Sequence, residues 1–155
     1  MTISPVRRLR ICRAVFALYL LVLFYVVLLM HGRSETFGDY NLIPGKSIRM
    51  FCEYYFRYHE FSFRYWFLNL FGNLLIFVPL GMLLPHLREG SGWRSVLVLS
   101  FLLSVSIEAL QYFSRLGEAD VDDVLLNVAG AMLGCALNHL ITRLLAHRSA
   151  KTKLS

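Results

Sequence analysis

The stretch WFLNLFGNLLIFVPLGMLLP, residues 66–85, decides the fold of this chain, because its twenty residues include no charged side chain. A helix that crosses the hydrocarbon core of a bilayer needs about 20 mainly apolar residues. Only helices and closed barrels satisfy their backbone hydrogen bonds within lipid, and a single apolar stretch of this length fits a helix. We therefore predict that residues 66–85 form a membrane-spanning helix.

Three other stretches have the same length and apolar character, at residues 14–30, 93–113 and 124–142. The first and the last contain no Asp, Glu, Lys or Arg, whereas the middle one contains only Arg94 and Glu108. Four arginines precede the first stretch, as in a signal peptide. However, its apolar run is longer than a signal core, and no small-x-small cleavage site follows it. We therefore interpret residues 14–30 as an uncleaved anchor.

The composition supports a membrane protein with one domain. Of the 155 residues, 57% are apolar and 17% are charged, whereas soluble domains have about 45–50% apolar and about 25% charged residues. The length allows one compact unit. We predict an all-α fold, an integral membrane bundle of four transmembrane helices in a single domain over residues 1–155, with basic tails at 1–13 and 143–155.

Lysine and arginine are distributed unequally between the two ends of the expected bundle. If the N-terminus lies in the cytoplasm, the cytoplasmic segments hold ten Lys and Arg residues and one acidic residue. The outer segments then hold six Lys and Arg residues and eight acidic residues. Cytoplasmic loops of membrane proteins carry the excess of Lys and Arg. We therefore predict that both termini are cytoplasmic. The net charge of +6 is explained by this topology, so we expect no nucleic-acid partner.

The longest connection, residues 31–65, contains a turn signal and an aromatic stripe. The turn signal is the sequence NLIPG at residues 41–45. Aromatic residues then recur at helical spacing, at Phe51, Tyr54, Tyr58, Phe61 and Tyr65. Because aromatic residues favour the membrane–water interface, we predict an amphipathic helix over about residues 51–65 that lies at the outer surface.

Polar side chains recur at helical spacing on the expected second, third and fourth spans, near the outer ends of those spans. Ionisable groups at membrane depth are costly and usually face a bundle interior or a wet cavity. We therefore predict a water-exposed polar cavity near the outer leaflet that binds a ligand, lined by Asn69, Asn73, Glu108, Gln111, Arg115, Asp120, Asp123 and Asn127. The alternative is structural: the amides join helices by hydrogen bonds, and Glu108 forms a buried ion pair with Arg115.

Four other positions predict helix packing. Gly130 and Gly134 form the small-xxx-small pattern that lets two membrane helices approach closely. Pro79 lacks a backbone N–H, so we expect it to bend its helix below the polar layer, and Gly81 follows it. The three cysteines lie too far apart for a metal-binding spacing or a disulfide framework, and we predict no metal site.

Four ordered blocks of the sequence resemble the VanZ-like family. They are NLIP at residues 41–44, NLFGNLLIFVPLGMLLP at 69–85, SIEALQ at 106–111 and RLGEADVDDVLLNVAGAMLG at 115–134. The resemblance covers about residues 41–137. It implies a bacterial cytoplasmic-membrane protein associated with glycopeptide resistance, through lowered sensitivity to teicoplanin, but it does not supply a reaction.

Three functions fit these observations, and we favour the first. It is a protein that binds, in the outer polar cavity, a membrane lipid or lipid-linked cell-wall precursor, or the lipid-anchored glycopeptide antibiotic. The second is an intramembrane enzyme acting on a lipid-linked phosphate or an envelope substrate, in which the acidic residues near Asp120 would hold Mg²⁺ as the sole cofactor. No recognised catalytic motif supports this enzyme. The third is an oligomeric membrane scaffold, a homo-oligomer joined through Gly130 and Gly134.

Overall fold

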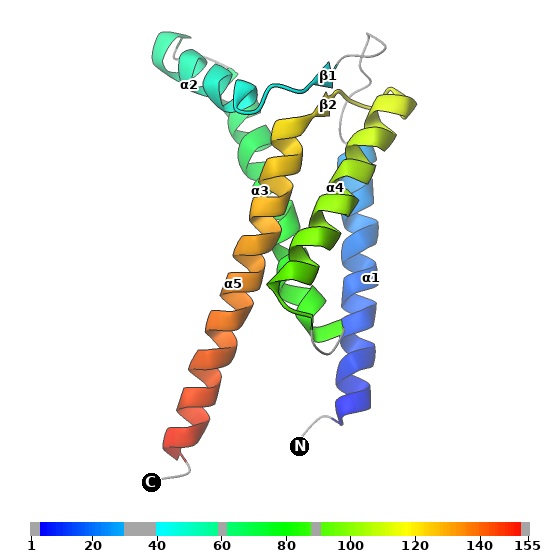
Figure 1. The fold of residues 1–155 in the computed structure, drawn as a ribbon, viewed down its shortest axis with the longest axis vertical. Helices are drawn as coiled ribbons and strands as arrows, with labels where there is room; N and C mark the ends of the chain where they lie inside the picture. The colour runs from blue at the N-terminus through cyan, green and yellow to red at the C-terminus, as the bar shows by residue number, and fades with distance from the viewer. Residues whose placement is uncertain (1–3, 30–39, 59–61, 88–90, 153–155) are drawn as a thin grey trace.

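The computed structural model describes residues 4–29, 40–58, 62–87 and 91–152. Four long helices and one shorter helix make up most of this part of the chain (Figure 1): α1 (Pro5–Leu29), α2 (Lys46–Tyr58), α3 (Ser62–Leu87), α4 (Trp93–Ser114) and α5 (Val121–Thr152). The four long helices are long and apolar enough to cross a membrane. The prediction of an all-α protein with four spanning helices is therefore confirmed, and the chain is a multi-pass membrane protein.

The spanning helices are longer than their apolar stretches. Helix α1 begins at Pro5 instead of residue 14, and α5 continues to Thr152 instead of ending at residue 142. The Ser4 hydroxyl accepts a hydrogen bond from Arg7 N at 3.4 Å, which helps to start α1. Pro5 occupies the first helical position, where its missing N–H costs nothing. An apolar run marks only the part of a helix that suits lipid, so it leaves out the charged turns that continue the same helix.

The predicted amphipathic helix exists as α2, but its predicted bounds, residues 51–65, are wrong. It begins earlier because residues 43–46 form a turn, in which Lys46 N donates a hydrogen bond to Ile43 O at 3.2 Å. Gly45 has a φ of 80° and follows Pro44, which is the arrangement of a type II turn. The predicted turn is thus confirmed. Residues 59–61 lie outside the described part of the chain, and α3 has already begun at Ser62.

Helix α2 points sideways from one end of the bundle (Figure 1), an orientation that suits a helix lying along a membrane surface. Close to its start, β1 (Tyr40–Asn41) pairs in parallel with β2 (Ala119–Asp120). The sequence did not predict these strands, because two residues are too few to show an alternating pattern. This short pairing connects the segment before α2 to the segment before α5.

Helices α3 and α5 make the most extensive contact in the bundle, α4 packs on α5, and α1 packs on α3. The buried core between them includes Leu23, Phe77, Ile107 and Ala131. The Tyr19 hydroxyl donates a hydrogen bond to the carbonyl oxygen of Ile76 at 2.9 Å, which joins α1 to α3. Helix α3 continues through Pro79, and the bend expected there stays a prediction.

Three glycines allow α3 and α5 to approach closely. A Cβ atom at Gly81, Gly130 or Gly134 would lie 1.8 Å, 1.9 Å or 2.0 Å, respectively, from a backbone carbonyl oxygen of the facing helix. No side chain tolerates such distances, so the two backbones meet here. The structure therefore places the Gly130 and Gly134 face inside the chain, against α3. The scaffold hypothesis required that face to meet a second copy, and it loses its basis.

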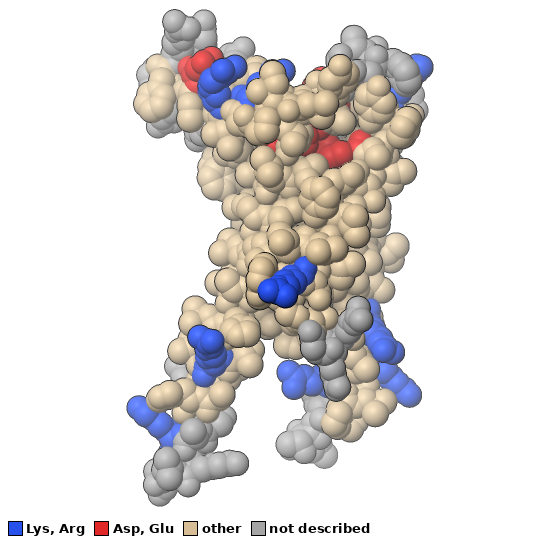
Figure 2. Space-filling model, in the orientation of Figure 1, with Lys and Arg blue, Asp and Glu red and all other residues tan. Residues whose placement is uncertain are grey.

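The two ends of the bundle differ in charge. Both ends of the chain lie at the same end of the bundle in Figure 1, opposite α2 and the two strands. On the face shown in Figure 2, the described Asp and Glu residues lie near α2 and the strands, with some Lys and Arg beside them, whereas the charged residues described toward the opposite end are Lys and Arg. We refer to the end with α2, β1 and β2 as the acidic end, and to the end with both termini as the basic end.

We predict that the basic end faces the cytoplasm, because Lys and Arg are retained on that side. In a chain whose other cysteines have been replaced, Glu118→Cys should react with a membrane-impermeant maleimide in intact cells. Ser155→Cys should react only after the membrane has been opened. Labelling of Ser155→Cys from outside intact cells would show that the predicted orientation is inverted.

Candidate functional site

The carboxylate of Asp120 holds the acidic end together. Its Oδ1 accepts hydrogen bonds from Asp122 N and from Asn41 Nδ2, both at 2.8 Å. Its Oδ2 accepts a hydrogen bond from the Ser47 hydroxyl at 2.7 Å. Asp120 thus caps the N-terminus of α5, as Asp does well. The same side chain also fixes the segment that connects β1 to α2.

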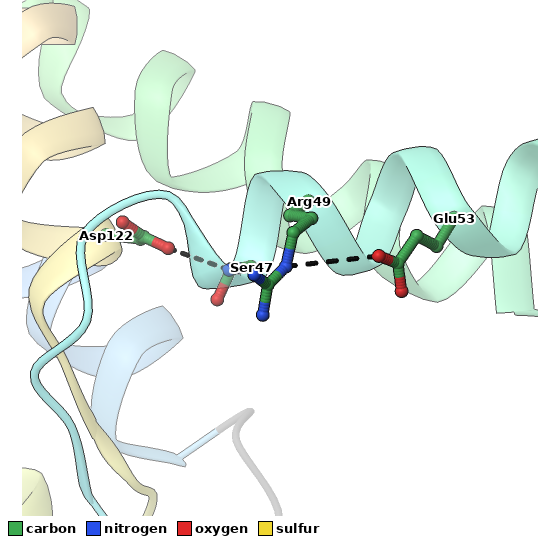
Figure 3. Close-up of polar contacts among 4 residues, drawn as sticks. All are labelled: Ser47, Arg49, Glu53 and Asp122. Atoms are coloured by element: carbon green, nitrogen blue, oxygen red, sulfur yellow. Dashed lines mark hydrogen bonds and ion pairs between the residues drawn. The ribbon is translucent and has the colours of Figure 1, made fainter.

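Asp122 is the most buried acidic side chain of this region, with 1% of its surface exposed. Its Oδ1 accepts a hydrogen bond from Gly45 N at 2.6 Å, and its Oδ2 accepts one from Ser47 N at 2.8 Å (Figure 3). A carboxylate at the N-terminus of α2 is also favoured by the helix dipole. Hydrogen bonds to charged groups contribute about 1.5–3 kcal/mol each. Asp122 therefore anchors the start of α2 to the start of α5.

Figure 3 also shows the ion pair between Arg49 and Glu53, one turn apart on α2. Its N–O distance is 4.0 Å, and the two side chains are 71% and 62% exposed. Exposed pairs of this kind contribute little to stability. The position of α2 is consequently set by Asp120 and Asp122 at its start.

Glu108 of α4 joins the same region from the other side. Its side chain is 7% exposed, and its Oε2 accepts a hydrogen bond from Asp120 N at 2.9 Å. The carboxyl group of Glu108 also lies near those of Asp120 and Asp123. Asp123 is half-buried and forms a side-chain hydrogen bond with Asn73 of α3. Three helices thus bring carboxyl and amide groups into one small region, where like charges repel strongly because little water screens them.

A second polar layer lies one or two turns deeper in the bundle. Asn127, which is 3% exposed, donates a hydrogen bond from its Nδ2 to the Ser104 hydroxyl at 2.9 Å. Its Oδ1 is buried and has no hydrogen-bond partner among the described residues. Gln111 lies on the other side of Glu108, about one turn nearer the acidic end; it is 4% exposed and donates to the carbonyl oxygen of Val27 at 3.3 Å, which ties α4 to α1. The Asn127 Oδ1 is an acceptor whose burial without a donor costs about 1–3 kcal/mol.

Two predicted site residues remain, Asn69 and Arg115. Asn69 lies on α3 one turn before Asn73, but its side chain is outside the described residues. Arg115 follows the last residue of α4 and is exposed. It has a φ of 58°, the left-handed conformation that side chains other than glycine seldom adopt. An exposed Arg115 does not form the buried ion pair with Glu108 that the sequence left open.

The described polar residues form a hydrogen-bonded network, and the water-exposed cavity that we expected them to line stays a prediction. Glu108, Gln111 and Asn127 are buried, whereas Asn73, Asp120 and Asp123 are half-buried, and these residues bond to one another or to neighbouring side-chain and backbone atoms. The structural alternative also finds support, because Asn127 and Gln111 join neighbouring helices by hydrogen bonds. Within the described residues, no group of three or more His, Cys, Asp and Glu is arranged to hold a metal ion.

These features define a class of protein: a helical membrane protein with four spans, in which a network of carboxylates and amides closes one end of an apolar bundle. Residues 16–142, which are most of the chain, match the VanZ/LLP1 family. The chain therefore belongs to this family, and the resemblance found in the four sequence blocks is confirmed.

Sequence similarity to one relative supports the same family. Protein VanZ of Enterococcus faecium is 27% identical over 132 residues, which are 81% of this chain and 71% of that protein. No solved structure matches the chain. The polar network described above therefore has no counterpart in a solved structure with which it can be compared.

Proposed function

We propose that this VanZ-like membrane protein lowers the sensitivity of a bacterium to teicoplanin by binding a ligand at its acidic end. The ligand is either a lipid-linked cell-wall precursor or the acylated drug itself. The observation that supports this most directly is the network of Glu108, Asp120 and Asp123 with Asn73. Ionisable groups are rare at membrane depth, and where they occur they generally serve function.

The chemistry of the acidic end suits such a ligand. The carboxylate of Asp123 and the amide of Asn73 are half-buried, and they offer acceptors to the hydroxyl, amide or ammonium groups of a glycopeptide or a muramyl peptide. Arg115 follows the end of α4, is exposed, and offers a guanidinium group to a phosphate or a carboxylate. Helix α2 would lie along the membrane surface, where a lipid tail and a polar head meet.

The other two functions have less support. An enzyme acting on a lipid-linked phosphate would use the acidic residues to hold Mg²⁺, and the described residues present no such group. A scaffold would use the Gly130 and Gly134 face, which packs against α3. The binding function needs neither a metal ion nor a second copy.

Equilibrium binding to the full chain in lipid nanodiscs tests the proposal. The probes are teicoplanin, a glycopeptide without an acyl chain, and a polyprenyl-diphosphate-linked muramyl pentapeptide. We expect saturable binding of teicoplanin or of the precursor, and about tenfold weaker binding by Asp123→Asn, which corresponds to loss of about 1.4 kcal/mol. The matched control is Glu118→Gln, which removes a charge from an exposed residue of the same end.

Each outcome is informative. Binding of teicoplanin alone identifies the drug as the ligand, and binding of the pentapeptide alone identifies the precursor. If neither probe binds in a saturable manner, or if Glu118→Gln weakens binding as much as Asp123→Asn does, the proposed site is incorrect.

A further inference from the structure

A groove lies toward the basic end of the bundle, on the side where α3 ends and α4 begins. It is bounded by the end of α3, the start of α4 and the middle of α5, and its volume is about 490 Å³. Sites for small molecules usually measure about 300–1,000 Å³. The lining includes apolar and cationic residues from all three helices: Pro85, Trp93, Met132, Cys135, His139 and Arg143.

The groove combines apolar walls with positive charge. Met132 and Cys135 contribute apolar wall, whereas His139 and Arg143 lie one turn apart on one face of α5 and are both exposed. The guanidinium carbon of Arg94 lies 5.4 Å from the centre of the Trp93 ring, which also lines the groove. Arg94 is therefore a second cation beside the groove, in addition to Arg143. It packs on Trp93, and tryptophan favours the membrane interface.

We propose that this groove binds one anionic glycerophospholipid from the leaflet at the basic end. Its phosphate contacts Arg143, with Arg94 adding to the attraction, and an acyl chain lies along Met132 and Cys135. Charge complementarity identifies the occupant, because the surrounding bilayer supplies molecules that join an apolar chain to an anionic head. Basic pockets between transmembrane helices bind such head groups. This site is separate from the acidic end and does not depend on the ligand proposed there.

Native mass spectrometry of the purified full chain tests the proposal. The probes are phosphatidylglycerol and phosphatidylcholine with identical acyl chains, added together in equal amounts. We expect a phosphatidylglycerol adduct about fivefold more abundant than the phosphatidylcholine adduct, and loss of this preference in Arg143→Gln. The matched control is Arg49→Gln, which removes an exposed arginine from the acidic end and should leave the preference unchanged.

A second pair of variants tests the position of the acyl chain. Ala136→Phe places a large side chain in the groove, whereas Ala129→Phe places the same side chain on an exposed position of α5 outside it. We expect Ala136→Phe to reduce the adducts of both lipids and Ala129→Phe to leave them unchanged. Because both variants enlarge an exposed alanine, a general loss of folding would affect them equally.

Four results would overturn the proposal. The first is equal binding of the two lipids, and the second is a full preference for phosphatidylglycerol in Arg143→Gln. The third is displacement of the lipid by inorganic phosphate alone, which would identify a site for a small anion. The fourth is a dimer that Ala136→Phe abolishes without any effect on lipid, which would make the groove an interface between copies.

Discussion

Gly134→Leu is expected to remove most of the folded protein from the membrane. A Cβ at this position would lie 2.0 Å from Val78 O and 3.1 Å from Met82 N, both of which are backbone atoms of α3. Backbone atoms cannot move aside as the end of a flexible side chain does. The added side chain therefore separates α3 from α5, the pair of helices with the most extensive contact. Overpacking a well-packed core costs about 1–3 kcal/mol of stability. A clash with backbone atoms should cost about 3 kcal/mol or more.

The measurements are membrane abundance and thermal stability of the purified chain in detergent. The matched control is Gly72→Ala, because a Cβ at Gly72 of α3 has nothing within 4 Å. Alanine is favoured over glycine in a helix by about 1 kcal/mol, so this variant should be as stable as the parent or slightly more stable. If Gly134→Leu were as abundant and as heat-resistant as the parent, the close approach of α3 and α5 would not be required for folding.

The second large effect is expected in Glu108→Gln, which should abolish the proposed teicoplanin resistance at near-normal protein abundance. Glutamine keeps the shape of glutamate, and its side-chain oxygen can still accept the hydrogen bond from Asp120 N. Hydrogen bonds between membrane helices average about 0.6 kcal/mol, so the structural cost is small. The change removes the ionisable carboxyl group of Glu108, which lies near those of Asp120 and Asp123. Drug sensitivity and membrane abundance should therefore be measured together.

Asp123→Asn and Arg115→Gln should behave like Glu108→Gln, and Arg115→Gly adds a control. Arg115 has a positive φ, which glycine adopts without the cost of up to about 1–2 kcal/mol paid by other residues. Arg115→Gly therefore removes the guanidinium group while it eases the backbone. Loss of resistance in this variant would indicate a role for the charge. Full resistance in Glu108→Gln, or resistance that falls only in step with protein abundance, would favour a structural role for the network.

The membrane fold could be predicted from the sequence because each span is a long apolar run with few or no charged residues, of which residues 66–85 are the clearest. The ends of the helices could not be predicted in the same way. Nothing in an apolar run reports that α1 starts at Ser4 and Pro5 or that α5 continues to Thr152. At the start of α1, the end is marked by the hydrogen bond that the Ser4 side chain accepts from the backbone and by Pro5 at the first helical position.

The meeting of Asn73, Glu108 and Asp123 could also be predicted, because helical spacing gives the face of a residue and its distance from the helix end gives its depth. The role of Asp122 could not. Its partners, Gly45 and Ser47, lie on a segment distant in the sequence, and no periodic pattern connects them. Residues 122 and 123 are adjacent, so they point in directions about 100° apart on α5. Asp123 consequently faces α3, whereas Asp122 faces the start of α2.

The contact of Asp122 with Gly45 and Ser47 can form only late in the synthesis of the chain. Its partners are separated by 77 and 75 positions, so the segment before α2 leaves the ribosome well before the residue that binds it. That segment must wait at the membrane surface while α3 and α4 are inserted. It closes only when the acidic start of α5 has reached the same side. A nascent chain that stops before residue 122 can therefore contain three spans and still lack a closed acidic end.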